Sequence, residues 1–134
     1  MALLEEISLR LSTQGVGTTS STATLQIVFR GFVPSTKDQQ IAIVPTGGFQ
    51  QFTERAPVER PTFQLLIRGK STGSTGLEAK VQGAIDALNF FDGTLLGRVY
   101  VDIQKQGEAH FLGRDEEERP LYSVNFLAHR SRTT

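Results

Sequence analysis

The sequence predicts a single α+β domain, in which a mixed sheet of four or five strands carries two helices packed on one face. Several segments alternate apolar and polar residues with the period of a strand, and two segments repeat apolar residues at helical spacing. The length of 134 residues suits one hydrophobic core and does not require a second domain. We therefore treat residues 1–134 as one unit.

The first helix is predicted at the N-terminus, where four apolar residues recur at helical spacing: Leu3, Leu4, Ile7 and Leu11. Glu6 precedes Arg10 by four residues, an orientation that favours an ion pair on a helix surface. The helix should end near Gly15, because the segment 15–23 has the glycine, serine and threonine content of a loop.

Two strands should follow this loop. Residues 24–32 alternate, which places three apolar side chains on one face: Leu25, Ile27 and Phe29. Residues 41–44 are a short apolar strand candidate, which Pro45 and the glycines after it should stop.

The strand at 61–68 is the clearest in the chain. Phe63, Leu65 and Ile67 alternate with polar residues, as expected for a strand with one buried face. Leu66 breaks this alternation and suggests that the second face is partly covered, as in the middle of a sheet.

The second helix should begin just after Thr75, because Thr75 and Glu78 have the spacing of a capping pair. Its apolar stripe comprises Leu77, Val81, Ala84, Ile85 and Leu88, which need a sheet to cover. Gly83 in mid-helix costs about 1 kcal/mol against alanine. We expect this glycine to mark a close approach to a neighbouring segment.

Two more strands complete the predicted sheet. In residues 99–104, three apolar residues alternate with three others: Val99, Val101 and Ile103. In residues 121–130, four side chains share one face: Tyr122, Val124, Phe126 and Ala128.

Composition excludes several classes of function. Lysine plus arginine equals aspartate plus glutamate, 14 against 14, so no overall field attracts nucleic acid or an anionic membrane. Cysteine is absent, which removes disulfides, thiolate catalysis and the usual structural zinc sites. The N-terminus lacks the basic start and continuous apolar run of a signal peptide, and no apolar segment reaches membrane-spanning length. We expect a soluble protein with no membrane partner, metal or cofactor.

The motifs that carry chemistry are weak. Residues 69–76 read GKSTGSTG, which has the letters of a phosphate-binding loop in the wrong order, so a turn before a helix explains them better. His110 and His129 have no carboxylate or second histidine at ligand spacing, so a catalytic dyad would have to be assembled by folding. The consecutive acids of 115–118 point in different directions on a loop and remain solvated. The sequence therefore predicts no enzyme.

The stretch 49–61 fits neither regular structure, because Phe49 and Phe52 stand among polar residues and two prolines. Two interpretations remain open. The phenylalanines can pack back into the domain, or they can anchor a partner, as aromatic residues on irregular segments often do.

Four stretches carry a family resemblance in the same order along the chain: LLEEISLRL at 3–11, AIVPTGG at 42–48, APVERPTFQLLIRG at 56–69 and FLGRDEEERPLYSVNF at 111–126. Together they resemble the tail terminator proteins of long-tailed bacteriophages, some of which are described as minor capsid or neck proteins. The most specific parts are Arg68 with Gly69 and the cluster of Leu112, Gly113, Arg114, Asp115, Glu116 and Arg119. Relatives usually have a turn residue such as glycine before the second arginine, where Glu118 stands here.

The resemblance implies a structural virion protein of the tail or neck, assembled in the bacterial host cytoplasm, with no catalytic residues. It implies a ring, commonly hexameric, that caps the head-proximal end of the tail tube, ends tube polymerisation and joins the tail to the head. The expected partners are further copies of the chain, the tail tube protein and a neck, stopper or connector protein. Genome DNA would pass through the lumen without specific binding.

Head-to-tail closure needs two complementary patches on each copy. The candidate partner-contact segments are 15–23, 45–61 and 105–120, and the candidate interface residues are Phe49, Phe52, Arg68, Arg114, Asp115, Glu116 and Arg119. Without the resemblance, the charged cluster would be a solvated hairpin loop with ion pairs worth under about 1 kcal/mol each. The candidate lumen-facing residues are Glu54, Glu59, Glu117 and Glu118, because acidic side chains release no counterions from DNA.

Two other classes of function stay open. One is another neck component, such as a head-tail stopper or a tail tube-like protein. The other is a small nucleic-acid-binding domain, which would display aromatic side chains with basic neighbours on an open sheet face. The strand aromatics of this sequence lie instead on the alternating apolar side.

Overall fold

A computed structural model describes residues 2–20, 25–31, 39–49, 58–69, 77–116 and 118–131. The elements in these ranges are α1 (Ala2–Thr13), β1 (Gln26–Phe29), β2 (Gln40–Phe49), β3 (Val58–Arg68), α2 (Leu77–Leu88), β4 (Gly93–Leu95), β5 (Arg98–Lys105), β6 (His110–Arg114) and β7 (Pro120–Ser131). Within this part of the chain, no helix combines the length and the apolar character needed to cross a bilayer.

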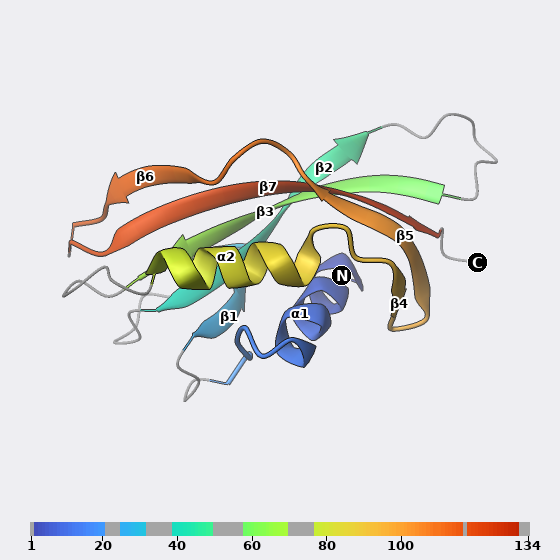
Figure 1. The fold of residues 1–134 in the computed structure, drawn as a ribbon, viewed down its shortest axis with the longest axis horizontal. Helices are drawn as coiled ribbons and strands as arrows, with labels where there is room; N and C mark the ends of the chain where they lie inside the picture. The colour runs from blue at the N-terminus through green and yellow to red at the C-terminus, as the bar shows by residue number, and fades with distance from the viewer. Residues whose placement is uncertain are drawn as a thin grey trace.

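All seven strands join one mixed sheet in the order β1-β2-β3-β7-β5-β4, with β6 also paired to β7. β1 and β2 are parallel, and the other pairs are antiparallel. One edge of β7 pairs with β3, while its other edge pairs with β6 near its start and with β5 near its end. The sheet arches over α1 and α2, which lie on the same side of it (Figure 1). The predicted α+β class, with both helices on one face, is confirmed.

The sheet has seven strands rather than the predicted four or five, because β4 and β6 carry no strand pattern. β4 is only three residues long and begins with Gly93. In β6, Phe111 and Leu112 stand next to each other before Gly113, so apolar and polar residues do not alternate. Both segments are extended because β5 and β7 offer them hydrogen-bonded partners, which a local pattern does not reveal.

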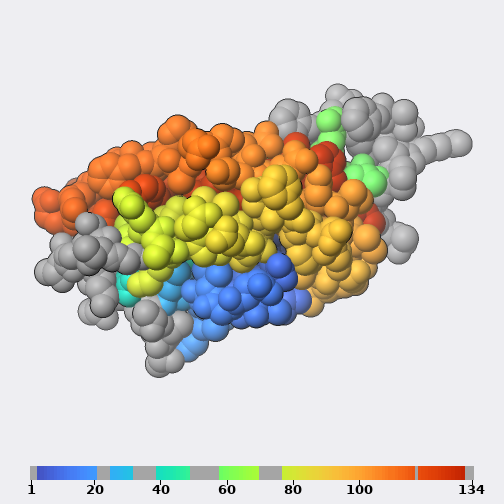
Figure 2. All heavy atoms as spheres, in the orientation of Figure 1, coloured from blue at the N-terminus to red at the C-terminus, as the bar shows by residue number. Residues whose placement is uncertain are grey.

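The hydrophobic core fills the space between the helices and the sheet. Both predicted helical stripes are confirmed, since the buried residues include Leu3, Leu4, Ile7 and Leu11 of α1 and Leu77, Val81, Ala84, Ile85 and Leu88 of α2. From the sheet, the rings of Phe63 and Phe126 stack with their centroids 5.3 Å apart. Each fully buried side chain of this kind contributes about 1.5–3 kcal/mol. Figure 2 shows α1 and α2 side by side over this core, with the β4–β5 hairpin beside them.

Gly83 does not mark a close approach, so that prediction is wrong. A Cβ atom at this position would meet no side chain and no neighbouring segment within 4 Å beyond the adjacent residues of its own helix. The glycine borders an open hollow between α2 and the connection from α1 to β1, and no packing contact offsets its helical cost. Thr75, the predicted cap, lies outside the described residues.

β2 continues through Pro45 to Phe49, so the predicted stop at the proline is wrong. The pairing with β3 shifts register between Pro45 and Gly48, where φ reaches 137°. A Cβ atom on Gly48 would lie 2.7 Å from the carbonyl oxygen of Arg60. The glycine therefore lets the strand bulge and continue close to its neighbour.

β1 is shorter than predicted and ends at Phe29, whose side chain is 41% exposed, unlike those of Leu25 and Ile27. Phe29 does not share their burial because it is the last residue of an edge strand. Arg30 follows with φ of 73°, and its amide still donates a 3.0 Å hydrogen bond to the Ile43 carbonyl of β2.

β5 carries a bulge that reverses its alternation. Val99 and Val101 are 52% and 58% exposed, whereas Tyr100 and Ile103 are buried. The residues on either side of Val101 pair with consecutive residues of β7, so Val101 is the extra residue. The predicted grouping of Val99, Val101 and Ile103 on one face is therefore wrong.

Candidate functional site

The two segments that carry the most specific parts of the family resemblance meet at one end of the β3–β7 ladder. The Gly69 amide donates a 3.0 Å hydrogen bond to the Pro120 carbonyl, and Arg68 lies opposite Leu121. Arg68 is buried, with 4% of its surface exposed. A Cβ atom on Gly69 would lie 2.9 Å from Leu77 of α2, so the glycine allows the helix to approach. Arg68 and Gly69 thus lie where the sheet, α2 and the β6–β7 hairpin meet.

The β6–β7 turn is closed by its own charged residues. The Asp115 carboxylate accepts hydrogen bonds from the Arg119 amide (2.9 Å) and from Arg119 Nε (2.8 Å). Arg114 Nη1 donates to the Glu118 carbonyl (2.8 Å). Glu116 is exposed, and Arg119 is buried. Folding therefore brings together Arg114, Asp115, Glu118 and Arg119.

Glu118 adopts a backbone conformation that usually favours glycine. Its φ is 63°, and its amide donates a 3.0 Å hydrogen bond to the Asp115 carbonyl. A left-handed residue at the end of the loop is typical of short hairpins. The turn is tight even though a glutamate takes the place of the usual turn residue.

At the other end of the sheet, Glu59 belongs to a network of charged residues. Its Oε1 atom accepts a 2.6 Å hydrogen bond from Arg130 Nε and a second one from Arg98 Nη1. Its side chain is 33% exposed. The negative charge of Glu59 is therefore compensated by two arginines of the same chain.

Glu6 is the buried centre of this network, with 1% of its surface exposed. Its Oε1 atom accepts hydrogen bonds from the Tyr100 hydroxyl (2.5 Å) and from Arg130 Nη1 (3.0 Å). Burial, together with the hydrogen bond to Glu6, raises the pKa of the Tyr100 hydroxyl above its ordinary value. The network joins α1 to β3, β5 and β7.

The predicted surface pair of Glu6 with Arg10 is wrong, because packing of α1 on the sheet buries Glu6. Arg10 Nε instead donates to the Ala87 carbonyl (2.7 Å), and its guanidinium lies over the Phe91 ring, 4.4 Å from the centroid. No motif in the sequence marks Tyr100, Arg98 or Arg130 as members of this network. The one available signal was the position of Glu6 beside the apolar stripe of α1.

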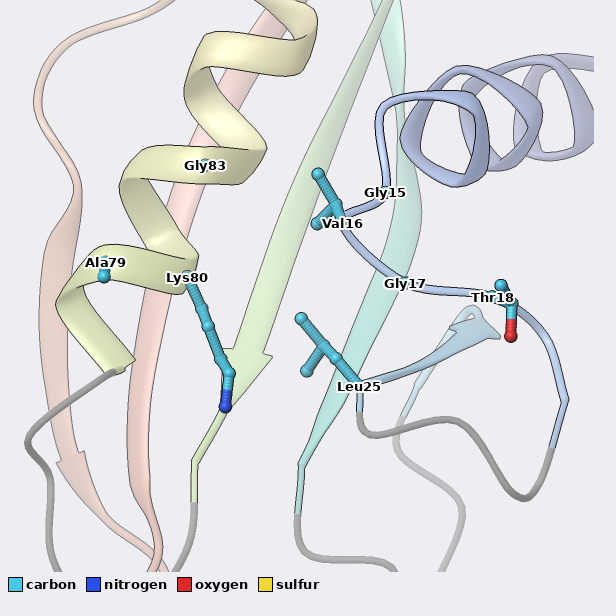
Figure 3. A pocket seen from close by; sticks show the side chains of 8 residues that line it. All are labelled: Gly15, Val16, Gly17, Thr18, Leu25, Ala79, Lys80 and Gly83. Atoms are coloured by element: carbon cyan, nitrogen blue, oxygen red, sulfur yellow. The ribbon is translucent and has the colours of Figure 1, made fainter.

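Two hollows flank α2. The larger, of about 480 Å³, lies between α2 and the α1–β1 connection, and the side chains of Val16 and Leu25 point into it (Figure 3). The smaller, of about 150 Å³, lies between α2 and the β6–β7 hairpin, where the rings of Phe111 and Tyr122 are 5.4 Å apart. The described lining of both hollows includes one carboxylate, Glu78, and no histidine. This lining does not assemble a general acid with a general base.

Folding does bring one histidine to a carboxylate. His129 Nδ1 on β7 lies 2.7 Å from Asp102 Oδ1 on β5, and Gln104 donates to the other oxygen at 3.0 Å. His110 is exposed on β6. Among the described residues, no group of three potential metal ligands comes together. The Asp102–His129 pair is a cross-strand contact, with no nucleophile among its recorded partners.

Four predicted residues cannot be placed by side chain. The backbone of Phe49 ends β2 opposite Arg60, but its side chain lies outside the described part of the structure. Phe52, Glu54 and Glu117 also lie outside it. Whether the phenylalanines pack inward or anchor a partner therefore stays a prediction.

Comparison with known protein families matches residues 10–132 to the bacteriophage tail terminator proteins. Among solved structures, a chain from the virion of a native gene transfer agent particle has a similar fold, with a TM-score of 0.74 and 12% identity over 98% of this chain and 96% of that chain. A search of curated proteins finds no match. Tail terminator proteins are structural, non-enzymatic components of the virion tail. With all but its ends covered by the match, this chain belongs to the bacteriophage tail terminator protein family.

Proposed function

We propose that copies of this chain, six in number, close into a ring at the head-proximal end of the tail tube. The ring ends tube polymerisation and joins the tail to the head or neck. The observation that carries this proposal is the family match over residues 10–132. The shape of the domain supports the proposal further. Its curled sheet ends in β1 at one edge and β4 at the other, and head-to-tail closure requires unlike surfaces on each copy.

The β6–β7 turn is our proposed contact with a neighbouring copy or a neck protein. The pair of Asp115 with Arg119 holds the turn in one conformation, so little entropy is lost when a partner binds it. Glu116 is exposed at this turn. The exposed Arg114 and Glu116 make the proposed contact, and Phe49, Phe52 and Asp115 are further candidates for it. Arg68 and Arg119 are buried, so we propose that they support the contact by holding the hairpin in place.

We also propose that acidic side chains face the lumen, where they let DNA pass without binding it. The candidates are Glu54, Glu59, Glu117 and Glu118. Non-specific binding to DNA is driven mostly by the release of counterions when basic side chains neutralise phosphates. Acidic side chains release no counterions from DNA and therefore do not favour binding. Glu59 contributes little to this field, because Arg98 and Arg130 compensate its charge.

Size-exclusion chromatography with light scattering, performed with and without tail tube protein, tests the ring. We expect a discrete oligomer near six copies, either alone or on the tube, and tube growth that stops when the protein is added. Virions that lack the protein should have tails of irregular length. Uniform tails joined to full heads in such virions would contradict the proposal.

The same experiments separate the other classes. Binding to a head connector without any effect on tube length would indicate a stopper-like neck component. Salt-sensitive binding to single-stranded nucleic acid would indicate a nucleic-acid-binding domain. We expect neither result.

A further inference from the structure

Six large hydrophobic side chains of the described residues are more than half exposed: Phe90, Leu96, Val99, Val101, Phe111 and Leu112. Five of them lie on the β4–β5 and β6–β7 hairpins, which are joined in the sheet by the pairing of β5 with β7. We define the hairpin patch as Leu96, Val99 and Val101 of the β4–β5 hairpin, and the β6 patch as Phe111 and Leu112. Neither patch is part of the core. Phe111 packs on Tyr122 across the hairpin, but more than half of each patch side chain remains exposed, which the packing of the domain does not explain.

Local backbone irregularities create this exposure. Val101 and Leu112 are each the extra residue of a β-bulge, and they are 58% and 55% exposed. Leu96 occupies the turn between β4 and β5 with φ of 49° and is 60% exposed. Asparagine or glycine would fit that turn better and would avoid an exposed apolar side chain. Bulges re-aim side chains and backbone outliers often mark functional sites, so these residues point to a contact outside the domain.

The two patches lie at opposite ends of β7. Leu112 is inserted next to the residue that pairs with Leu121, whereas the Val99 amide donates to the Ser131 hydroxyl. These two positions are ten residues apart along β7, which corresponds to roughly 30 Å at about 3.3 Å per residue. Figure 1 shows β6 at one end of the molecule and the β4–β5 turn at the other. One copy therefore cannot bring its own two patches together.

We infer that the β6 patch of one copy docks onto the hairpin patch of the next copy. This inference rests on the proposed ring and names the surfaces that close it. The patches differ in side-chain type, since only the β6 patch has an aromatic ring, and a head-to-tail contact joins unlike surfaces. The bulges interrupt both strands, so side chains make the contact and the sheet does not continue between copies.

The size of the patches suits the centre of such an interface. Two or three half-exposed side chains of this size present on the order of 200 Å² of surface. A stable interface buries about 800 Å² per partner, with apolar anchors at its centre and a polar rim. The charged β6–β7 turn, with exposed Arg114 and Glu116, lies next to the β6 patch and can supply part of that rim.

Two surface variants test the contact. Leu96→Asn with Val101→Thr replaces two of the three apolar side chains of the hairpin patch, and Leu112→Ser replaces one of the two in the β6 patch. We expect each variant to fold as the wild type does, since these side chains are exposed, and to assemble at least about tenfold more weakly, as for interface anchors. Leu9→Gln, at a 39% exposed position on α1, is the matched control and should assemble normally. If both patch variants form wild-type rings, the inference fails while the proposed ring stands.

Engineered cysteines test which patch meets which, because the chain has no cysteine of its own. We expect oxidised Val101→Cys/Leu112→Cys to give a ladder of covalent oligomers from assembled rings, and each single variant to stay monomeric in a denaturing gel. Dimers from a single variant would show that a patch meets itself, and cross-links to tail tube protein would show that it faces the tube. Either result overturns the inference. A wild-type protein that stays monomeric with and without tail tube protein would instead defeat the ring proposal itself.

Discussion

Glu118 adopts a backbone conformation that is unfavourable for a residue with a side chain. Its φ of 63° is costly for residues other than glycine, by about 1 kcal/mol or more. Both of its recorded hydrogen bonds use backbone atoms, the amide to Asp115 and the carbonyl from Arg114. The turn therefore depends on the conformation at this position and not on the carboxylate.

Glu118→Gly should raise the free energy of unfolding by about 0.5–1 kcal/mol, because glycine adopts this φ without steric cost but has more freedom in the unfolded chain. Urea denaturation followed by circular dichroism measures the change. Glu116→Gly is the control, since Glu116 lies in the same turn and is not among the residues with positive φ. Equal stabilisation by both substitutions would show that loss of negative charge, and not φ, is responsible.

Helices and strands in this protein use glycine for different reasons. Gly83 has open space around it in α2, whereas Gly48 in β2 has a positive φ and lies against the backbone of β3. The first glycine only weakens its helix. The second permits a close approach between two strands.

Alanine substitution should therefore have opposite effects at these two positions. Gly83→Ala should raise the free energy of unfolding by about 0.5–1 kcal/mol, because alanine is the better helix former. Gly48→Ala should lower it, because the new Cβ atom would meet the Arg60 carbonyl oxygen at 2.7 Å. Thermal and urea unfolding of both variants measure the effects. A destabilised Gly83→Ala would mean that α2 packs more closely there than the structure shows.

For the molecule as a whole, the network around Glu6 connects α1 to the sheet through hydrogen bonds and ion pairs. Glu6 of α1 binds Tyr100 of β5 and Arg130 of β7, and Arg130 also binds Glu59 of β3. Removing one member of such a group leaves a buried charge without its partner, which is more costly than the loss of one hydrogen bond. The packing of α1 on the sheet therefore depends on side chains distant in sequence.

This network predicts a loss of stability at alkaline pH. The pKa of Tyr100 is raised in the folded protein, whereas tyrosine in the unfolded chain ionises near pH 10. Above about pH 10 the unfolded state loses a proton that the folded state keeps, so the free energy of unfolding should fall as pH rises. The slope from one such group approaches about 1.4 kcal/mol per pH unit.

Urea denaturation between roughly pH 8 and 11 measures this dependence. Tyr100→Phe is the control, because it keeps the ring and removes the ionisable hydroxyl. The wild type should lose stability more steeply than the variant above about pH 10. Parallel curves for the two proteins would contradict the role given to Tyr100.

The sequence by itself determined the α+β class, both helical stripes, the central strands and the family signature at Arg68 and Arg114 to Arg119. These features are local, because a helix or strand that packs on one core places apolar residues at its own period along consecutive positions of the sequence. Tertiary structure decided β4 and β6, the bulges at Val101 and Leu112, and the partners of Glu6. Such features depend on which distant segments pair across the sheet and which polar groups become buried beside each other, and no local pattern records those choices.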